Sequence, residues 1–138
     1  NQDIESLNNN RVLIHVRRQD YLKLGINLPK SYYENSINLL KKELEEFEFD
    51  IFTDDKEWVL SQNVFSDFRK IYGEDSEPTM SFKKMLCYKH FIIANSTYSY
   101  LAAFFGEKQD SKVLMPYRWS AKKNKDFLTD NSWKKVQF

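Results

Sequence analysis

The sequence predicts one α/β domain, and three observations support this class. Short apolar runs recur along the chain, at residues 12–14, 49–53, 91–94 and 112–115. Between them lie segments with apolar residues at steps of three and four, the spacing of an amphipathic helix. At 138 residues the chain is long enough for one hydrophobic core and too short for two ordinary domains. Strands alternating with helices favour a mainly parallel, Rossmann-like sheet with flanking helices.

The beginning of the chain is expected to hold a polar segment, a strand and a loop. Residues 1–10 are rich in asparagine and form a polar lead-in. Residues 12–14, Val-Leu-Ile, form the first strand, because an unbroken aliphatic run suits a sheet covered on both faces. Residues 21–30 contain Gly25 and Pro29, so we expect an irregular loop there.

A long amphipathic helix and a second strand follow. Ser31 and Glu34 have the spacing of a capping box, which predicts a helix beginning at Ser31. The apolar stripe of this helix consists of Tyr33, Ile37, Leu40, Leu44 and Phe47. The second strand, residues 49–53, ends in Asp54 and Asp55, and an aspartate at this place can cap a short helix.

The middle of the chain shows weaker patterns and then a clear one. Residues 64–65 and 68–72 are expected as strand edges. Ser81 is expected to cap a helix. Residues 91–94, Phe-Ile-Ile-Ala, form the clearest buried strand of the chain.

The last third opens with a polar turn at residues 95–97. A helix over residues 98–105 follows and is expected to end at Gly106 in the left-handed conformation. Residues 112–115 form a last strand, stopped by Pro116. Loops and a terminal helix are expected after it, anchored by three aromatic residues. These are Trp119, Phe127 and Trp133.

Composition excludes several classes of function. The net charge is only +1, so bulk charge gives no support to a nucleic-acid partner. A single cysteine, Cys87, cannot form an internal disulfide and fits a reducing compartment. No apolar run approaches the roughly 20 residues that a membrane-spanning helix needs, and residues 1–10 lack the apolar centre of a signal peptide. We therefore expect a soluble, cytoplasmic protein.

Polar chemistry concentrates where the first strand ends, at His15, Arg17, Arg18 and Asp20. In open α/β sheets, ligands bind at the carboxyl ends of the strands. His15 and Arg17 share one face of the strand, whereas Arg17 and Arg18 diverge. An arginine fork holds phosphate oxygens by charge-assisted hydrogen bonds of about 1.5 to 3 kcal/mol each. Two plainer alternatives stay open: an exposed pair of Arg18 with Asp20, worth at most about 1 kcal/mol, and a core role for His15.

Two other strand exits are polar as well. Asp54 and Asp55 follow the second strand, and Asn95, Ser96 and Thr97 precede a helix whose N-terminus favours an anion. Taken singly, each is better explained as a helix cap. Together, three polar exits in one parallel sheet predict a nucleotide site. No histidine and cysteine spacing suits a metal, and no glycine-rich phosphate loop occurs, which disfavours a dinucleotide oxidoreductase or an NTPase.

Five segments of the chain carry a resemblance to a known family. They are HVRRQDYL, LPKSYYENSINLL, IFTDD, CYKHFIIANSTYSYLAAFFG and VLMPYRW. In this order and spacing, residues 12–119 resemble the donor-binding, carboxyl-terminal half of the bacterial α-1,2-fucosyltransferases. The H-x-R-R-x-D motif is shared with the α-1,6-fucosyltransferases, so the resemblance fixes the donor more firmly than the linkage.

The resemblance implies one half of a GT-B-like enzyme that transfers fucose from GDP-β-L-fucose with inversion, without a cofactor or a required metal. It implies that Arg17 is catalytic and stabilises the leaving GDP. The other donor-binding residues that it implies are His15, Asp54, Asp55, Asn95, Ser96 and Thr97, with Arg18 and Asp20 in support. The sequence departs from the family in two places. Gln19 replaces a usual glycine, and Tyr100 with Leu101 replaces a common tryptophan pair.

The same resemblance sets expectations for the whole enzyme. The amino-terminal half, which helps to form the acceptor cleft, is expected to be missing from residues 1–138, so this single donor-binding domain alone should be inactive. The acceptor would be an oligosaccharide or glycolipid, joined through an α-1,2 linkage to galactose in O-antigen or lipopolysaccharide synthesis. Peripheral association with the inner face of the membrane is left open. The alternative is a non-catalytic nucleotide-binding α/β module.

Overall fold

Six strands form one sheet in the order β3-β2-β1-β4-β5-β6, and every neighbouring pair is parallel. The computed structural model describes residues 10–73, 78–119 and 132–138. The strands are β1 (Arg11–Val16), β2 (Glu48–Thr53), β3 (Lys70–Gly73), β4 (His90–Ile92), β5 (Val113–Pro116) and β6 (Lys134–Val136). The strand order and helical crossovers confirm the predicted Rossmann-like α/β class.

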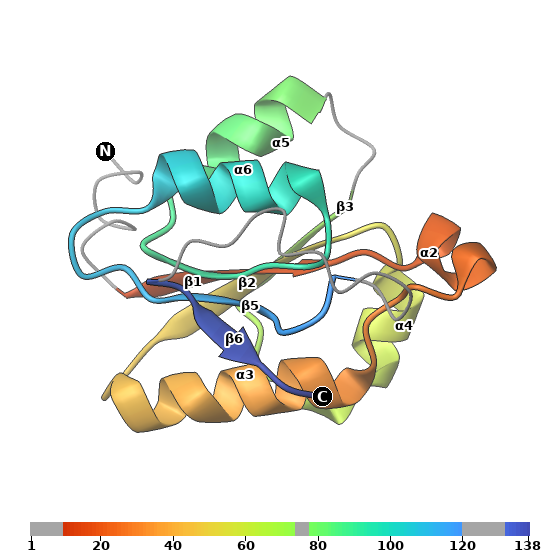
Figure 1. Ribbon diagram of the computed structural model, residues 1–138, viewed down its shortest axis with the longest axis horizontal. Helices are drawn as coiled ribbons and strands as arrows, with labels where there is room; N and C mark the ends of the chain where they lie inside the picture. The colour runs from red at the N-terminus through yellow and green to blue at the C-terminus, as the bar shows by residue number, and fades with distance from the viewer. Residues whose placement is uncertain (1–9, 74–77, 120–131) are drawn as a thin grey trace.

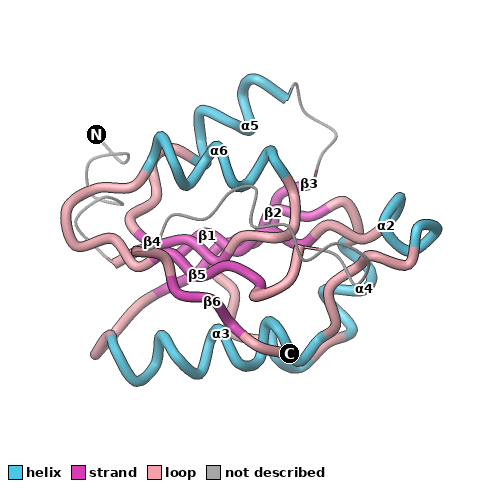
Figure 2. Tube along the Cα trace, in the orientation of Figure 1, coloured by secondary structure: helices cyan, strands magenta, loops and turns pink. Residues whose placement is uncertain are grey.

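Helices cover both faces of the sheet (Figures 1 and 2). They are α2 (Gln19–Leu24), α3 (Lys30–Glu43), α4 (Lys56–Ser61), the 3-10 turn η1 (Asn63–Phe65), α5 (Pro78–Met85) and α6 (Thr97–Gly106). The layer with α3 packs on one face, and α5 with α6 packs on the other. No helix in these described segments is long and apolar enough to cross a membrane.

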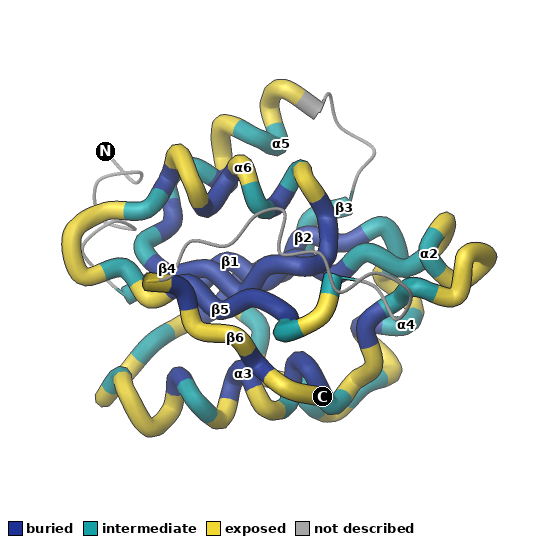
Figure 3. The backbone as a smooth tube through the Cα atoms, in the orientation of Figure 1, coloured by how far each residue is buried: buried dark blue, intermediate teal, exposed yellow. Residues whose placement is uncertain are grey.

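The alternation of side chains along β1 builds both halves of the core. Val12, Ile14 and Val16 pack toward α3, whereas Leu13 packs toward α5 and α6. All four side chains are fully buried, and Figure 3 shows the central strands buried between two partly exposed helical layers. His15 therefore belongs to the face of α5 and α6, as its parity with Leu13 requires.

Several local predictions are wrong for identifiable reasons. The expected loop at residues 21–30 contains most of α2, which ends at Gly25 in the left-handed conformation, φ +68°. Pro29, rather than Ser31, precedes α3, because proline suits the start of a helix. Ser81 lies inside α5, and the expected strand edge at residues 64–65 is a 3-10 turn.

Gly106 corrects another prediction. It is the last residue of α6 and does not have a positive φ. An added Cβ atom would lie 3.0 Å from Cζ of Phe91 and 3.2 Å from Cα of Leu86. Close packing of α6 on its neighbours, and not a left-handed turn, is what this glycine allows.

The prediction of a terminal helix is wrong for residues 132–138, the last segment that the structure describes. There the chain forms β6, which pairs with β5. Trp133 is buried and its indole Nε1 donates a hydrogen bond to Glu107 at 2.8 Å. Phe127 lies outside the described residues. A three-residue strand carries too little periodicity to be recognised from sequence.

Candidate functional site

The strand order reverses between β1 and β4, and this switch point is where open α/β sheets bind ligands. From β1 the chain continues to β2 and β3 on one side, and then crosses to β4, β5 and β6 on the other. The three polar clusters expected from the sequence all follow carboxyl ends of β1, β2 and β4. The fold therefore brings them to one edge of the sheet.

Asp54 holds the connection between β1 and α2. Its Oδ1 accepts a hydrogen bond from the backbone amide of Arg18 at 2.8 Å, and its Oδ2 accepts one from the amide of Gln19 at 3.0 Å. The Asp54 side chain is only 6% exposed. The carboxylate thus satisfies two amides at the N-terminus of α2, where a negative charge is also favoured by the helix dipole.

Asp55 and Trp58 fix the side chain of Arg18. Asp55 caps α4 by accepting from the amide of Trp58 at 3.1 Å, and its other oxygen lies 3.4 Å from Nε of Arg18. The guanidinium carbon of Arg18 lies 3.8 Å from the centre of the Trp58 ring, a cation–π contact. The structure thus places Arg18 in contacts with protein, in keeping with the supporting role that stays a prediction.

Arg17 stands on the more open side of the same connection. Its Nε lies 3.5 Å from Asp54 and its Nη2 lies 3.4 Å from Asp20, while 27% of its side chain is exposed. Such long, partly exposed ion pairs are worth about 1 kcal/mol or less. A phosphate could therefore compete for this guanidinium, and Asp20, whose side chain is 72% exposed, helps to aim it.

The turn at the exit of β4 prepares the N-terminus of α6. Ser96 has an extended backbone, and its hydroxyl accepts a hydrogen bond from the amide of Tyr98 at 3.2 Å. The hydroxyl of Ser99 accepts a hydrogen bond from the amide of Ala94 at 3.2 Å, which stabilises the turn. Ser96 is buried and Thr97 is exposed. The first-turn amides and the dipole of this helix favour an anion.

Tyr21 joins the two sides of the switch point, a role that the sequence reasoning missed. Its hydroxyl donates a hydrogen bond to the carbonyl of Asn95 at 3.0 Å. The guanidinium of Arg17 lies 5.6 Å from the centre of its ring. Tyr21 therefore connects Arg17, at the exit of β1, to the turn before α6. Helical spacing gave no signal for this contact, because Arg17 precedes α2.

Asn95 is buried beneath this link. Its Nδ2 donates to the carbonyls of Ile26 at 2.8 Å and of Trp119 at 2.9 Å. Its Oδ1 is buried and accepts no hydrogen bond from the residues that the structure describes. An asparagine normally satisfies both ends of its amide, but this oxygen is closed to solvent, so a ligand does not reach it in this conformation.

His15 is buried, with 1% of its surface exposed, and its ring centre lies 6.1 Å from that of Tyr98. This position is next to α6 and to the exit of β1. It agrees equally with a core histidine and with a wall of the nucleotide site, so its predicted role stays a prediction. Among the residues with described positions, no cluster of three His, Cys, Asp or Glu side chains could hold a metal.

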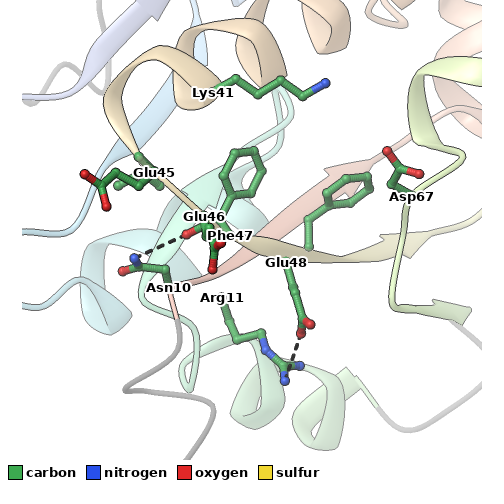
Figure 4. Close-up of a pocket in the computed structure, with 10 residues that line it drawn as sticks. Asn10, Arg11, Lys41, Glu45, Glu46, Phe47, Glu48 and Asp67 are labelled. Carbon is green, nitrogen blue, oxygen red and sulfur yellow. Dashed lines mark hydrogen bonds and ion pairs between the residues drawn. The ribbon is translucent and has the colours of Figure 1, made fainter.

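A pocket of about 730 Å³ lies at the other end of the strands, around the first residues of β1 and β2 (Figure 4). Its acidic residues are Glu45, Glu46, Glu48 and Asp67, against the basic Arg11 and Lys41. Arg11 is already paired with Glu48 at 3.0 Å. The excess of carboxylates opposes binding of a phosphate. In addition, sheets of this kind bind nucleotides at the carboxyl ends of their strands, whereas this pocket lies at the amino ends.

Comparisons with known proteins identify one family and two relatives. The model of the family described as Glycosyl transferase family 11 matches residues 1–137. An O-antigen biosynthesis glycosyltransferase of Escherichia coli, WbnK, is 33% identical over 91% of this chain and 44% of its own length. An alpha-1,2-colitosyltransferase of Escherichia coli is 32% identical over 80% of this chain and 41% of its own length. The chain thus spans less than half the length of these relatives. No solved structure matches it significantly.

Proposed function

The chain belongs to glycosyltransferase family 11, and from this premise we propose that it binds GDP-β-L-fucose as the donor domain of an inverting fucosyltransferase. One observation carries the proposal. Arg17 and the N-terminus of α6 lie on the two sides of the switch point, and Tyr21 links them. A pyrophosphate held there would meet a guanidinium on one side and helix amides on the other.

In this proposal Arg17 is the catalytic residue. As the bond from fucose to the β-phosphate breaks, negative charge grows on the departing GDP, and an arginine aimed at that oxygen stabilises the transition state more than the bound donor. Ser96 and Thr97 hold the pyrophosphate at the start of α6. Because Arg17 and α6 supply the positive field, the proposed reaction requires no metal and no cofactor.

Recognition of guanosine is assigned to His15, Asp54 and Asp55. A carboxylate can accept hydrogen bonds from two N–H groups of guanine, and a carboxylate oxygen that already has one donor keeps a second lone pair. The oxygens of Asp54 already receive the amides of Arg18 and Gln19. Its effect on the donor therefore includes the placement of Arg17, which directly precedes those amides.

The acceptor and the linkage belong to the complete enzyme. We propose transfer to a sugar hydroxyl, through an α-1,2 linkage to galactose, in cytoplasmic O-antigen synthesis. The support is the name of each relative: one acts in O-antigen biosynthesis and the other forms an α-1,2 linkage. The second name also favours a second donor, GDP-colitose, whose sugar is fucose without the 3-hydroxyl.

Titration of the chain with GDP, GDP-fucose and UDP tests the donor. We expect binding of both guanine nucleotides and at least tenfold weaker binding of UDP, about 1.4 kcal/mol. Equal affinity for GDP and UDP would refute the fucosyltransferase proposal. GDP-colitose in the same titration decides between the two sugars. In a longer enzyme that contains this domain, donor hydrolysis or transfer separates a transferase from the alternative, a nucleotide-binding module without activity.

Arg17→Lys is the matched variant for the catalytic role, because it keeps the charge and removes the planar fork. We expect GDP-fucose affinity to fall less than about tenfold while kcat of the longer enzyme falls more than a hundredfold, as a transition-state contact requires. An unchanged kcat would remove Arg17 from the mechanism.

A further inference from the structure

β1 and β4 stop pairing at the switch point. The last pair in their register is Ile14 beside Ile92. The amide of Ile93 donates to a carbonyl of β5 at 3.0 Å, and because successive amides of a strand point to opposite sides, the amide of Ala94 faces β1. In a parallel ladder of this register, the next hydrogen bond would join the amide of Ala94 to the carbonyl of His15.

Two side-chain hydroxyls take the place of that hydrogen bond. The amide of Ala94 donates to Oγ of Ser99 at 3.2 Å, and the hydroxyl of Tyr33 donates to the carbonyl of His15 at 3.1 Å. Tyr33 is 1% exposed, and Ser99 is fully buried. Burial raises the pKa of Tyr33, so its hydroxyl keeps the proton that it donates. The amide and the carbonyl therefore both have partners without bonding to each other.

The two hydroxyls reach the end of this ladder from opposite faces of the sheet. Tyr33 belongs to α3 and Ser99 belongs to α6, the helices that Figure 1 shows below and above the strands. Buried backbone groups are costly to leave without a partner. If the hydroxyls were removed, the simplest way to satisfy the amide and the carbonyl would be to extend the ladder by one hydrogen bond.

Tyr32, next to Tyr33 in α3, acts in the same way at the neighbouring strand pair. To continue the ladder between β4 and β5, residue 116 would have to donate its amide hydrogen to the carbonyl of Ile93, and Pro116 has no amide hydrogen. The hydroxyl of Tyr32 donates to that carbonyl at 2.5 Å instead. Adjacent tyrosines of α3 thus supply the donors where two ladders end.

The end of the β1–β4 ladder determines where the two halves of the proposed site stand. Arg17 lies two residues after His15, and the turn at residues 95–97 follows β4. One more ladder bond would draw these two segments together. We propose that Tyr33 and Ser99 are positioning residues, whose hydroxyls keep β1 and β4 apart so that a diphosphate fits between Arg17 and the N-terminus of α6. The inference rests on the proposed function.

A measurement without ligand tests whether the hydroxyls hold the ladder open. Tyr33→Phe keeps the ring and removes only the hydroxyl, so the amide of Ala94 should turn to the carbonyl of His15. The new hydrogen bond should give a scalar coupling between the amide nitrogen of Ala94 and the carbonyl carbon of His15, absent from the unmodified chain. Ser99→Ala releases the same amide from the other face and should give the same coupling. If both folded variants lack it, the inference is overturned.

Nucleotide titration tests the consequence for binding. In the proposed function GDP spans both sides of the switch point, whereas guanosine contacts only residues that belong to β1 or follow β2. In Tyr33→Phe we therefore expect the Kd of GDP to rise at least about fivefold and the Kd of guanosine to change less than about twofold. Equal changes in the two Kd values would overturn the positioning role.

Tyr88→Phe is the matched control, because it also removes a buried hydroxyl. Tyr88 is 7% exposed, and its hydroxyl donates to Asp50, in the first half of β2. This variant should unfold at a lower urea concentration, while both Kd values change less than about twofold. A loss of GDP affinity equal to that of Tyr33→Phe would show a general effect of stability and overturn the inference. If the unmodified chain binds no GDP, the proposed function is refuted, and the scalar coupling still decides whether the hydroxyls hold the ladder open.

Discussion

Replacing Asp54 by alanine should loosen the connection that presents Arg17. The carboxylate accepts hydrogen bonds from the amides of Arg18 and Gln19, at 2.8 and 3.0 Å, and is 6% exposed. Hydrogen bonds to a charged group contribute about 1.5 to 3 kcal/mol each. After the change, water can replace the carboxylate as the partner of the Gln19 amide. We therefore expect the loss of both hydrogen bonds to lower the free energy of unfolding by about 2 to 4 kcal/mol.

Urea unfolding of Asp54→Ala, followed by fluorescence of the three tryptophans, measures this loss. Asp20→Ala is the matched control, because Asp20 contacts Arg17 as Asp54 does, but its side chain is 72% exposed. We expect this variant to lose less than about 0.5 kcal/mol in free energy of unfolding. GDP affinity should fall in Asp54→Ala as well. Equal unfolding midpoints for Asp54→Ala, Asp20→Ala and the unmodified chain would refute the reasoning that Asp54 holds this connection.

Three other predictions concern separate parts of the fold. Replacing Ser96 and Thr97 together by alanine should weaken GDP binding more than guanosine binding, and equal losses in the two titrations would count against a phosphate contact. Burial, reinforced by nearby lysines, lowers the pKa of His90 from 6.5 to about 4, so the unfolded chain takes up a proton that the folded chain does not. The stability that neutral His90 contributes is complete above pH 6.5 and is lost as the pH falls toward 4; a His90→Gln protein should lack this part of the slope in urea unfolding at pH 7, 6 and 5. Gly106→Ala should cost about 1 to 3 kcal/mol of stability by overpacking, whereas Gly25→Ala, where no atom lies within 4 Å of the added carbon, should cost about 1 kcal/mol from its positive φ alone; thermal unfolding that ranks them the other way would contradict the packing account.

The alternation of strands and helices was predictable because buried strands leave an unbroken apolar run. Residues 12–14 and 49–53 were placed correctly within β1 and β2, and the three polar clusters were correctly placed after strands of one sheet. Short elements were not predictable. In α2 no residue is buried, so it has no apolar stripe to recognise, and β6 has three residues of which one is buried. Their conformations depend on tertiary contacts rather than on local pattern.

Sequence reasoning found the charged residues of the site but not their partners. Arg17 and Arg18 were correctly expected to diverge, and the structure shows why they differ: Arg18 stacks on Trp58, whereas Arg17 faces Tyr21. Neither aromatic contact follows from spacing alone, because Trp58 comes from a helix 40 residues later in the chain. The contacts of Asn95 were also invisible in the sequence, because its amide nitrogen reaches the carbonyls of two residues distant in the chain, Ile26 and Trp119.

The hydrogen bonds of Asp54 also bear on how fast a ligand can bind. They hold the backbone directly after Arg17 before any ligand arrives, so little chain entropy remains to be lost when a phosphate docks. Capture of GDP should therefore be a single bimolecular step, with an observed rate that rises linearly with GDP concentration. Without the carboxylate, the loop would first have to find its bound shape, and the rate would level off at the speed of that search.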